Sequence, residues 1–423
     1  MTSATLGRSA TALPGASHAR SSSAIIDCQA SPAQPKPLHV AFALGGTDLG
    51  RSGIGTYVRE VLPPLIERVQ AAGGQLTAFG SPAELAAYAE ALRGARTRRL
   101  RGVPQRAAAN ALWHLFRAGT FARKLGADVL LLPAANRRIS RSAELPTVAV
   151  VHDLAQLRVA EKYDALRMYY FRRVLLPAFQ RPTRLLAVSG ATRHDLIRAL
   201  GIPEDRVGVV YNGVNARQFA AVDRASPAVW AARQRVGLHT KPYLLYPARL
   251  EHPGKNHVRL LRAFAQSGLA STHTLALSGA DWGGEAIIRS TARELGIDHA
   301  LNFLGFVSVE TLPLLVAGAE AVLMLGLHEG FGLPPLEALC AGRPVCVSNT
   351  GALPEVVGPL GVQCDPLDEA DIARALQRVV RDAPMRNRCQ AEGPTWAERF
   401  SWTRTAEGLF EACQDAVTVA APK

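Results

Sequence analysis

The stretch Leu38–Val69, LHVAFALGGTDLGRSGIGTYVREVLPPLIERV, decides the fold class. Its first seven residues form an apolar run typical of a buried strand. Glycines follow at positions 45, 46, 53 and 55, and an apolar-periodic helical segment begins at Thr56. A strand, a glycine-rich loop and a helix in this order predict the opening βα unit of a nucleotide-binding domain.

The same alternation of strand and helix continues along the chain in two series. In the first series, further strands are predicted at Gln75–Phe79, Asp128–Leu132, Thr147–Val151, Arg184–Val188 and Val207–Tyr211. In the second, they are predicted at Tyr243–Tyr246, Thr274–Ser278, Asn302–Leu304, Ala321–Leu325 and Pro344–Val347, with helices near 256–268, 284–295, 310–318, 334–341 and 368–381. Such alternation favours parallel sheets covered on both faces. We therefore expect an α/β protein with two Rossmann-like domains whose parallel sheets face across a deep cleft, and ligands at the carboxyl ends of the strands.

Composition places the boundaries of these parts. We expect a disordered tail over 1–37, a first domain over 38–215, a linker over 216–240, a second domain over 241–400, and a last helix in 401–423 that crosses back toward the first domain. The tail is rich in Ser, Ala and Pro, which favours disorder over the alternative of an organellar transit peptide. No run of about 18 uncharged apolar residues occurs, so no membrane-spanning helix is expected.

Charge is distributed unevenly. The 423 residues carry a net charge of +13, but residues 1–220 hold 29 Lys and Arg against 14 Asp and Glu. An excess of this size suits nucleic acid, an anionic membrane surface or a polyanionic substrate. A genome that favours arginine would also explain it. The six cysteines form no metal-binding spacing, which indicates buried, reduced thiols in a cytosolic protein.

One segment, 86–125, combines basic and apolar residues. Its basic residues are Arg93, Arg96, Arg98, Arg99, Arg101, Arg106, Arg117, Arg123 and Lys124, and they alternate with Leu100, Leu112, Trp113, Leu115 and Phe116. A basic amphipathic helix with Trp and Phe is typical of an interfacial membrane helix. The alternative is an ordinary surface helix, with its charged face in solvent and its apolar face packed on the core.

The most specific chemical signal is HEGFGLPPLE at 328–337, between an apolar strand and a helix that starts with prolines. Its glycines allow backbone N–H groups to approach a ligand, and the start of the helix favours an anion. Glu329 and Glu337 are placed to accept hydrogen bonds from the hydroxyls of one ligand. The alternative for Glu337 is a solvated helix residue.

Two more signals follow predicted strands. Arg249 and Lys255 flank a Pro-Gly turn after the strand YLLYPA, where two cations can hold a diphosphate. His152 and Asp153 follow the strand that ends in Val150-Val151, so the imidazole faces the expected cleft and Asp153 is placed to orient it or to meet the acceptor. The alternative for His152 is a structural histidine.

Several motifs are missing from the sequence. It has no Asp-x-Asp, the short motif by which many nucleotide-sugar enzymes hold a divalent metal, and neither the G-x-S-x-G elbow nor a P-loop. Phosphate neutralisation by Arg249, Lys255 and helix dipoles therefore replaces a metal in this interpretation, and we expect no cofactor and no obligatory metal.

The run HEGFGLPPLEALCAGRPVCVSNTGALPEVVG strongly resembles the signature of the retaining family 4 glycosyltransferases, which have the GT-B fold. The resemblance extends over most of residues 38–413 and includes GGTDLGRSGIGTYV, VVHDL, PARLEHPGKN and FSWTRTAEGLFEA. The leucine- and proline-rich version looks most like bacterial mannosyltransferases of polysaccharide assembly that use GDP-mannose, and UDP-sugar enzymes of the family carry similar loops.

The resemblance implies a role for each matching position. Glu329 would contact the transferred sugar and Glu337 the ribose. Backbone groups of Gly330, Phe331 and Gly332 would meet sugar and phosphate, and Leu333 belongs to the same donor-binding set. Arg249 and Lys255 would bind the diphosphate, Gly46 would approach the distal phosphate, His152 would lie beside the reacting sugar, and Phe306 and Val307 would contact the base.

The resemblance also implies the reaction and the partners. The expected reaction is transfer of a hexosyl group with retained configuration from GDP-mannose or a UDP-sugar to a lipid-linked or growing glycan. We expect a cytoplasmic protein, in contact with an anionic membrane surface if segment 86–125 binds lipid. An epimerase or a phosphorylase of the same fold is the alternative enzyme class. A nucleic-acid-binding protein is the non-enzymatic alternative, and the absence of a known nucleic-acid motif counts against it.

Overall fold

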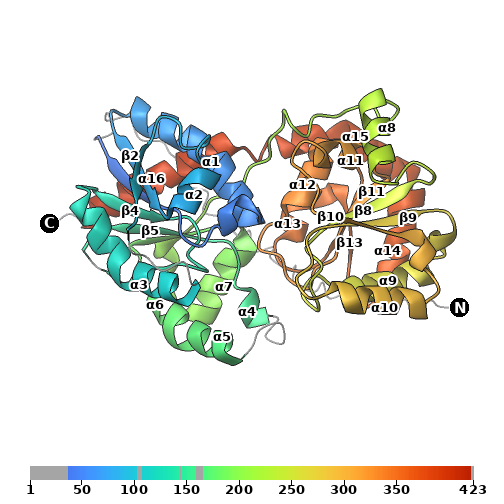
Figure 1. The fold of residues 1–423 in the computed structure, drawn as a ribbon, viewed down its shortest axis with the longest axis horizontal. Helices are drawn as coiled ribbons and strands as arrows, with labels where there is room; N and C mark the ends of the chain where they lie inside the picture. The colour runs from blue at the N-terminus through green and yellow to red at the C-terminus, as the bar shows by residue number, and fades with distance from the viewer. Residues whose placement is uncertain (1–36, 102–106, 143, 159–164, 421–423) are drawn as a thin grey trace, which may run out of the picture. The chain divides into compact units, whose positions relative to one another are not determined.

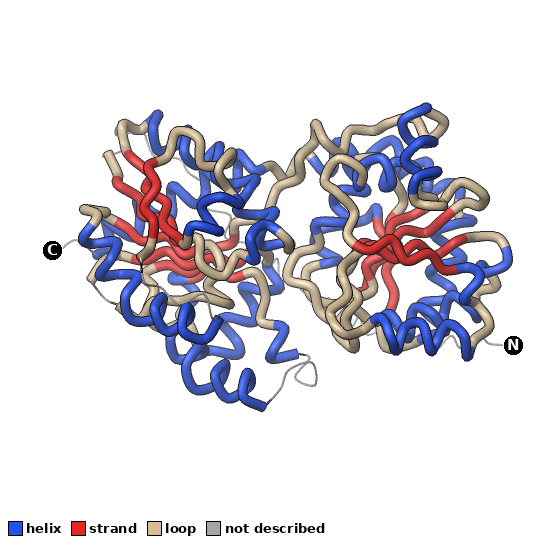
Figure 2. Tube along the Cα trace, in the orientation of Figure 1, coloured by secondary structure: helices blue, strands red, loops and turns tan. Residues whose placement is uncertain are grey.

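The computed structural model describes residues 37–101, 107–142, 144–158 and 165–420. It contains two separate parallel sheets, each with helices on both faces (Figures 1 and 2). The predicted fold class of two parallel-sheet α/β domains is confirmed. The tail that we expect over 1–37 lies almost wholly outside the described residues.

The first sheet has seven strands in the order β3-β2-β1-β4-β5-β6-β7. The strands are β1 (His39–Ala43), β2 (Gln75–Gly80), β3 (Arg96–Arg99), β4 (Val129–Leu132), β5 (Thr147–Val151), β6 (Arg184–Ala187) and β7 (Val207–Val209). The helices of this half are α1 (Gly53–Ala71), α2 (Pro82–Ala87), α3 (Ala107–Lys124), α4 (Ala155–Arg158), α5 (Ala165–Tyr170), α6 (Leu176–Ala178) and α7 (Gly190–Leu200).

The second sheet has six strands in the order β10-β9-β8-β11-β12-β13. They are β8 (Tyr243–Pro247), β9 (Thr274–Ser278), β10 (Leu301–Gly305), β11 (Ala321–Met324), β12 (Val345–Ser348) and β13 (Gly361–Cys364). The helices are α8 (Pro227–Arg235), α9 (His257–Gln266), α10 (Glu285–Glu294), α11 (Leu312–Gly318), α12 (Leu333–Cys340), α13 (Leu353–Val357), α14 (Glu369–Arg381), α15 (Ala383–Ala397) and α16 (Trp402–Ala420).

The central strands are buried from end to end. Every residue of β4, β5, β11 and β12 is buried, and these strands consist almost entirely of Val, Leu, Ala and Met. A strand that helices cover on both faces has no polar side, so its sequence is continuously apolar instead of alternating. This burial fixes the strand ends, from which the functional loops start.

Each sheet has one place where the strand order reverses direction. In the first sheet it lies between β1 and β4, and in the second between β8 and β11. Loops that leave the carboxyl ends of two such neighbouring strands run to opposite faces of the sheet, and the crevice between them is the usual ligand site of open α/β sheets. Two candidate crevices therefore follow from the topology.

The chain returns from the second sheet to the first through its last helix. Helix α16 packs along α1, and its first residue, Trp402, lies edge-on to Tyr57 of α1 with ring centroids 5.8 Å apart. A carboxylate makes a second connection between the halves. Glu355 of α13 accepts hydrogen bonds from the Gly190 N–H at 2.9 Å, at the start of α7, and from the Tyr211 hydroxyl at 2.5 Å.

The prediction of one basic amphipathic helix in segment 86–125 is wrong. Arg96, Arg98 and Arg99 lie on the exposed edge strand β3, and only Ala107–Lys124 is helical. Of the apolar residues in the segment, Leu100 and Leu115 are buried and Trp113 packs on the ring of Phe79. Arg106 lies outside the described residues. The arginines of β3 were assigned to the polar face of a helix because exposed arginine is common both on edge strands and on helices.

In the second half, sequence reasoning also missed helices α8, α13 and α15 and strand β13. Helix α8 lies in the stretch that we expected to be a linker, and it packs against α11. Its sequence carries a weak amphipathic pattern, so tertiary packing decides its conformation.

The five cysteines of the described chain are buried and unpaired, as predicted, and Cys28 lies outside it. None of the described helices has the length and apolar character needed to span a lipid bilayer.

Candidate functional site

At the crevice of the second sheet, a lysine and a glutamate form an ion pair. Lys255, in the loop after β8, places Nζ 2.7 Å and 3.0 Å from the two carboxylate oxygens of Glu329, in the loop after β11. The two loops are also joined by the Leu327 N–H, which donates to the Gly254 carbonyl at 3.0 Å. Both side chains keep some exposure, 18% and 14%, so the pair borders solvent.

The second predicted cation has a different partner. Arg249 pairs with Glu251 at 3.1 Å, and its guanidinium lies 4.3 Å from the centre of the Trp282 ring. Sequence reasoning did not identify Glu251 or Trp282 as its neighbours. An ion pair on one side and an aromatic face on the other hold the guanidinium plane, and more than a quarter of the side chain remains exposed.

The glycine loop offers backbone donors beside this ion pair. Within the described chain, the N–H groups of Gly330, Phe331 and Gly332 donate to no protein acceptor. The loop leads directly into α12, which has prolines in its first turn. Free N–H groups at the start of a helix attract an anion, because the helix dipole adds to them.

Gly330 is in direct contact with the first half of the chain. A Cβ atom on Gly330 would lie 1.7 Å from the His152 carbonyl oxygen and 2.9 Å from Cβ of Asp153. The Thr192 hydroxyl also donates to the Gly330 carbonyl at 3.4 Å. Only glycine fits this approach, so the loop and the His152-Asp153 turn lie side by side.

His152 is buried and neutral. Its Nε2 is 2.7 Å from the Pro133 carbonyl, which can only accept, so Nε2 carries the proton and Nδ1 keeps a lone pair. Burial lowers the pKa of His152 to about 4. Tyr57 packs edge-on against the ring at 4.7 Å. Asp153 is turned to its own backbone, where it accepts from the Ala155 N–H at 3.2 Å.

Glu337 forms no ion pair with Arg249 or Lys255 among the described residues. Its carboxyl is largely enclosed, and burial followed by the charge of Glu60 raises the pKa of Glu337 to about 8. Glu60 comes from α1 and accepts a hydrogen bond from the Asn215 amide at 3.2 Å. Sequence reasoning missed Glu60, because nothing in α1 indicates which face meets the second half.

The crevice of the first sheet is basic. Gly46 has φ of +83°, which favours glycine, and Arg137 and Arg138 crowd the position of its missing side chain. Arg137 donates to the Gly46 carbonyl at 3.3 Å and pairs with Asp48. The two arginines follow β4, so an examination of the loop after every strand would have found them.

The remaining predicted residues divide into exposed and buried. Phe306 follows β10 and is 70% exposed, whereas Val307 packs partly against the core. The Phe331 side chain is buried against Tyr211 and Phe400, so only the backbone of this loop residue is available to a ligand. Leu333 is half-buried at the start of α12. No group of three or more His, Cys, Asp or Glu within the described residues is arranged to hold a metal ion.

Two parallel sheets, each with a glycine loop and basic side chains at its crevice, define a nucleotide-binding α/β protein. Comparison with known families gives the particular group. The family model for Glycosyltransferase Family 4 matches residues 51–218, and that for Glycosyl transferases group 1 matches residues 229–396. The chain belongs to the group 1 glycosyltransferases of family 4.

Individual relatives are distant. The chain is 29% identical over 257 residues to O-antigen chain mannosyltransferase B of Escherichia coli, a match that covers 60% of this chain and 66% of the relative. It is 31% identical over 268 residues to the serotype-specific mannosyltransferase WbdA of Escherichia coli, covering 62% of this chain and 32% of that protein. The match thus spans just under two thirds of the first relative and about a third of the second.

A solved structure shares the fold. HepE of Anabaena in complex with UDP and glucose superposes with a TM-score of 0.70 at 19% identity, covering 88% of this chain and 98% of HepE. At 19% sequence identity, this structural similarity establishes the GT-B fold of the chain and nothing more specific.

Proposed function

We propose that this protein is a retaining glycosyltransferase that takes a hexosyl group from a nucleoside-diphosphate sugar bound at the crevice of the second sheet. The observation that carries the proposal is the partly exposed Lys255–Glu329 pair beside the free N–H groups of Gly330, Phe331 and Gly332. A cation, a hydroxyl acceptor and anion-binding amides lie there within one pair of loops.

The main chemical demand of the reaction is the charge that develops on the departing nucleoside diphosphate. Arg249 and the N–H groups at the start of α12 are fixed donors for that charge, and Lys255 becomes a donor when it leaves Glu329. Glu329 accepts from the sugar hydroxyls once Lys255 turns to phosphate. Glu337 is protonated near pH 7, so it can both donate to and accept from a ribose diol. Phe306 and Val307 border the base.

His152 and Asp153 lie on the opposite side of the glycine loop, next to Gly330. Because Nε2 of His152 is committed to Pro133, its free Nδ1 accepts from a sugar hydroxyl and does not donate to phosphate. Gly46 approaches the distal phosphate, with Arg137 and Arg138 adding positive charge on that side. Asp153 meets the acceptor.

The donor we favour is GDP-mannose, since the relatives named above are an O-antigen chain mannosyltransferase and a serotype-specific mannosyltransferase. A UDP-sugar is the alternative, which the UDP and glucose in HepE support. The acceptor class follows from the same relatives: a lipid-linked or growing polysaccharide.

A binding panel tests this proposal. Purified protein is titrated with GDP-mannose, UDP-glucose, UDP-GlcNAc and UDP-galactose, and binding is measured by thermal shift and calorimetry. We expect one nucleotide sugar to bind, and Lys255→Ala and Glu337→Ala to weaken it by about tenfold or more. Lys241→Ala is the matched control, because Lys241 precedes β8 whereas Lys255 follows it. Unchanged affinity in both site variants would exclude this site.

We also infer that the first half works at an anionic membrane surface. Helix α3 exposes Leu112 and Phe116, one turn apart, by 50% and 57%, with Arg117 beside them. All four residues of the edge strand β3, three of them arginines, are exposed as well. Apolar side chains among basic ones are the composition of an interfacial surface.

Vesicle co-sedimentation tests the membrane inference. Wild-type protein should partition onto vesicles with anionic lipid and much less onto neutral ones, and Leu112→Ser/Phe116→Ser should reduce binding to the anionic vesicles. Equal partition onto both kinds of vesicle, or no effect of the double variant, would contradict it.

A further inference from the structure

A cavity of about 390 Å³ lies in the second half, away from the candidate donor site. Its wall includes Glu320, which immediately precedes β11, and Pro344, which immediately precedes β12. The cavity is therefore at the amino ends of these strands, whereas Lys255 and Glu329 lie at the carboxyl ends of β8 and β11. Its volume falls within the range of small-molecule pockets.

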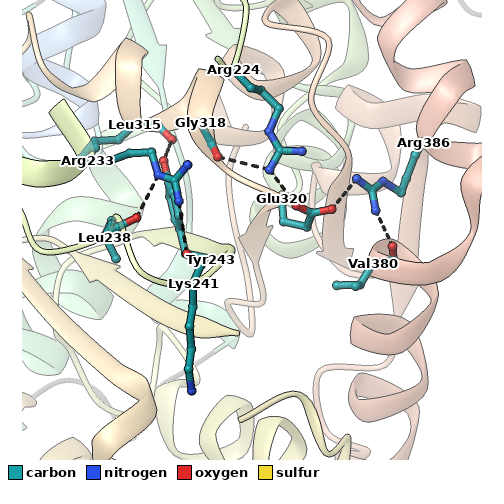
Figure 3. Close-up of polar contacts among 10 residues, drawn as sticks. All are labelled: Arg224, Arg233, Leu238, Lys241, Tyr243, Leu315, Gly318, Glu320, Val380 and Arg386. Atoms are coloured by element: carbon teal, nitrogen blue, oxygen red, sulfur yellow. Dashed lines mark hydrogen bonds and ion pairs between the residues drawn. The ribbon is translucent and has the colours of Figure 1, made fainter. Parts of the chain in front are cut away.

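Three arginines from three separate elements line this cavity (Figure 3 shows two of them). Arg224 comes from the segment before α8, Arg343 from the turn between α12 and β12, and Arg386 from α15. Two of them share one carboxylate. Arg224 donates to one oxygen of Glu320 at 2.7 Å, and Arg386 pairs with the other oxygen. Both oxygens of Glu320 are thus committed.

Arg343 lacks such a carboxylate partner among the described residues. Its one protein hydrogen bond within the described chain runs from Nε to the Ala341 carbonyl at 3.3 Å. Burial and the neighbouring charge of Arg224 lower the pKa of Arg343, and Glu320 acts in the opposite direction. Asp223 also borders the cavity, but it accepts from the Ala225 N–H at 2.9 Å as part of its own turn.

We propose that this cavity is a second binding site, separate from the donor site, for a small phosphate-bearing anion held by Arg343 together with Arg224 and Arg386. Guanidinium groups bind phosphate with paired N–H groups, which is why arginine is common wherever phosphate is recognised. The ion pairs with Glu320 fix Arg224 and Arg386 in place before the ligand arrives. Arg343 supplies the charge that Glu320 does not neutralise.

The volume leaves room for more than a bare phosphate ion, so a phosphorylated sugar or a similar ester is the expected ligand class. The cavity also borders Ala341 and Gly342, directly after the C-terminal end of α12, the helix whose first turns carry the glycine loop and Glu337. The site nevertheless stands without the proposed function, because its residues take no part in donor binding.

Calorimetry on the full chain tests the proposal, with inorganic phosphate and a hexose monophosphate as probes at low ionic strength. We expect at least one probe to bind the wild type and Arg343→Gln to weaken it by about tenfold or more. Arg388→Gln is the matched control. Arg388 lies on the same helix as Arg386 and pairs with Glu392, but it does not line this cavity.

A Lys255→Gln variant separates this site from the donor site, which also has affinity for phosphate. Binding that persists in Lys255→Gln and falls in Arg343→Gln supports the cavity. Binding that disappears in Lys255→Gln and is unchanged in Arg343→Gln belongs to the donor site and overturns the proposal, as does the absence of any binding to the wild type. Tighter binding of the hexose monophosphate than of inorganic phosphate identifies a phosphorylated metabolite as the ligand, and the reverse order identifies free phosphate.

Discussion

The two crevices of this protein use different chemistry on the same topology. The crevice of the second sheet holds a partly exposed Lys255–Glu329 pair and free N–H groups, and these residues belong to two short sequence motifs. The crevice of the first sheet holds a neutral, buried His152 and two arginines around Gly46. Positive charge therefore lies at both crevices, and the two differ in how it is partnered: Lys255 pairs with Glu329 in the second, and Arg137 with Asp48 in the first.

The largest effect should come from breaking the ion pair in the second crevice. Lys255→Ala leaves Glu329 without its cation and removes a donor to the departing diphosphate, so kcat/KM should fall by about 100-fold or more. Steady-state kinetics with the best donor of the panel measure it. Lys241→Ala should keep wild-type kinetics, and a similar loss in both variants would indicate a general effect of lysine removal.

A substitution at the contact between the two crevices should have the next largest effect. Gly330→Ala places Cβ 1.7 Å from the His152 carbonyl oxygen, a backbone atom that no rotamer change can move. We expect the free energy of unfolding to fall by about 1–3 kcal/mol. We also expect the activity to fall under conditions in which the variant is still fully folded. Urea unfolding and kinetics measure both. Gly53→Ala is the control, since its Cβ meets no atom within 4 Å; a Gly330→Ala variant as stable and active as this control would disprove the contact.

In the first crevice, His152→Asn should lower kcat/KM by about tenfold, because Asn keeps polarity but loses the packing against Tyr57. The pKa of His152 is about 4, so the ring stays neutral across pH 6–8 and adds no inflection to the pH profile there. Profiles of kcat/KM from pH 5 to 9 should therefore have one shape in both proteins. An inflection near pH 6.5 that the variant lacks would show a titrating His152.

The last prediction concerns stability instead of catalysis and comes from Glu337. Burial raises its pKa in the folded protein to about 8, from an ordinary value of 4.5 that applies to the unfolded chain. The unfolded chain releases this proton first, so the folded state loses stability as pH rises from about 4.5 to 8. Glu337→Gln lacks this loss and should be more stable than the wild type by about 1–3 kcal/mol at pH 8.5, with a smaller gap at pH 5.

Urea unfolding at the two pH values measures this difference. The exposed Glu407 of α16 provides the matched control, and Glu407→Gln should show no such widening. A constant difference between Glu337→Gln and the wild type at both pH values would mean that Glu337 titrates normally.

The sequence predicted most of the fold because the buried strands are continuously apolar and the loops carry glycine. Prediction from the sequence failed where one local pattern fits both a strand and a helix. The segment Arg96–Arg99 is polar throughout, so its arginines fitted the charged face of a helix as well as an exposed strand. The edge position that exposes them depends on pairing with β2.

The same limit applies to the site. Glu329, Lys255 and Gly330 lie in compact motifs and were predicted, and the Lys255–Glu329 contact joins two of these motifs. Glu60 and Trp282 were missed because their proximity to the site arises only from folding, and no short-range pattern distinguishes them from ordinary surface residues. Arg137 is different, because it lies in the loop after β4 and a search of every strand end would have found it.

The most direct measurement is a crystal structure of the complex with the nucleoside diphosphate of the preferred donor. We predict diphosphate oxygens within hydrogen-bonding distance of Lys255 Nζ and of the N–H groups of Phe331 and Gly332. A nucleotide bound elsewhere, with Lys255 and Glu329 still paired and in contact with solvent alone, would contradict the assignment of the donor site to the second crevice.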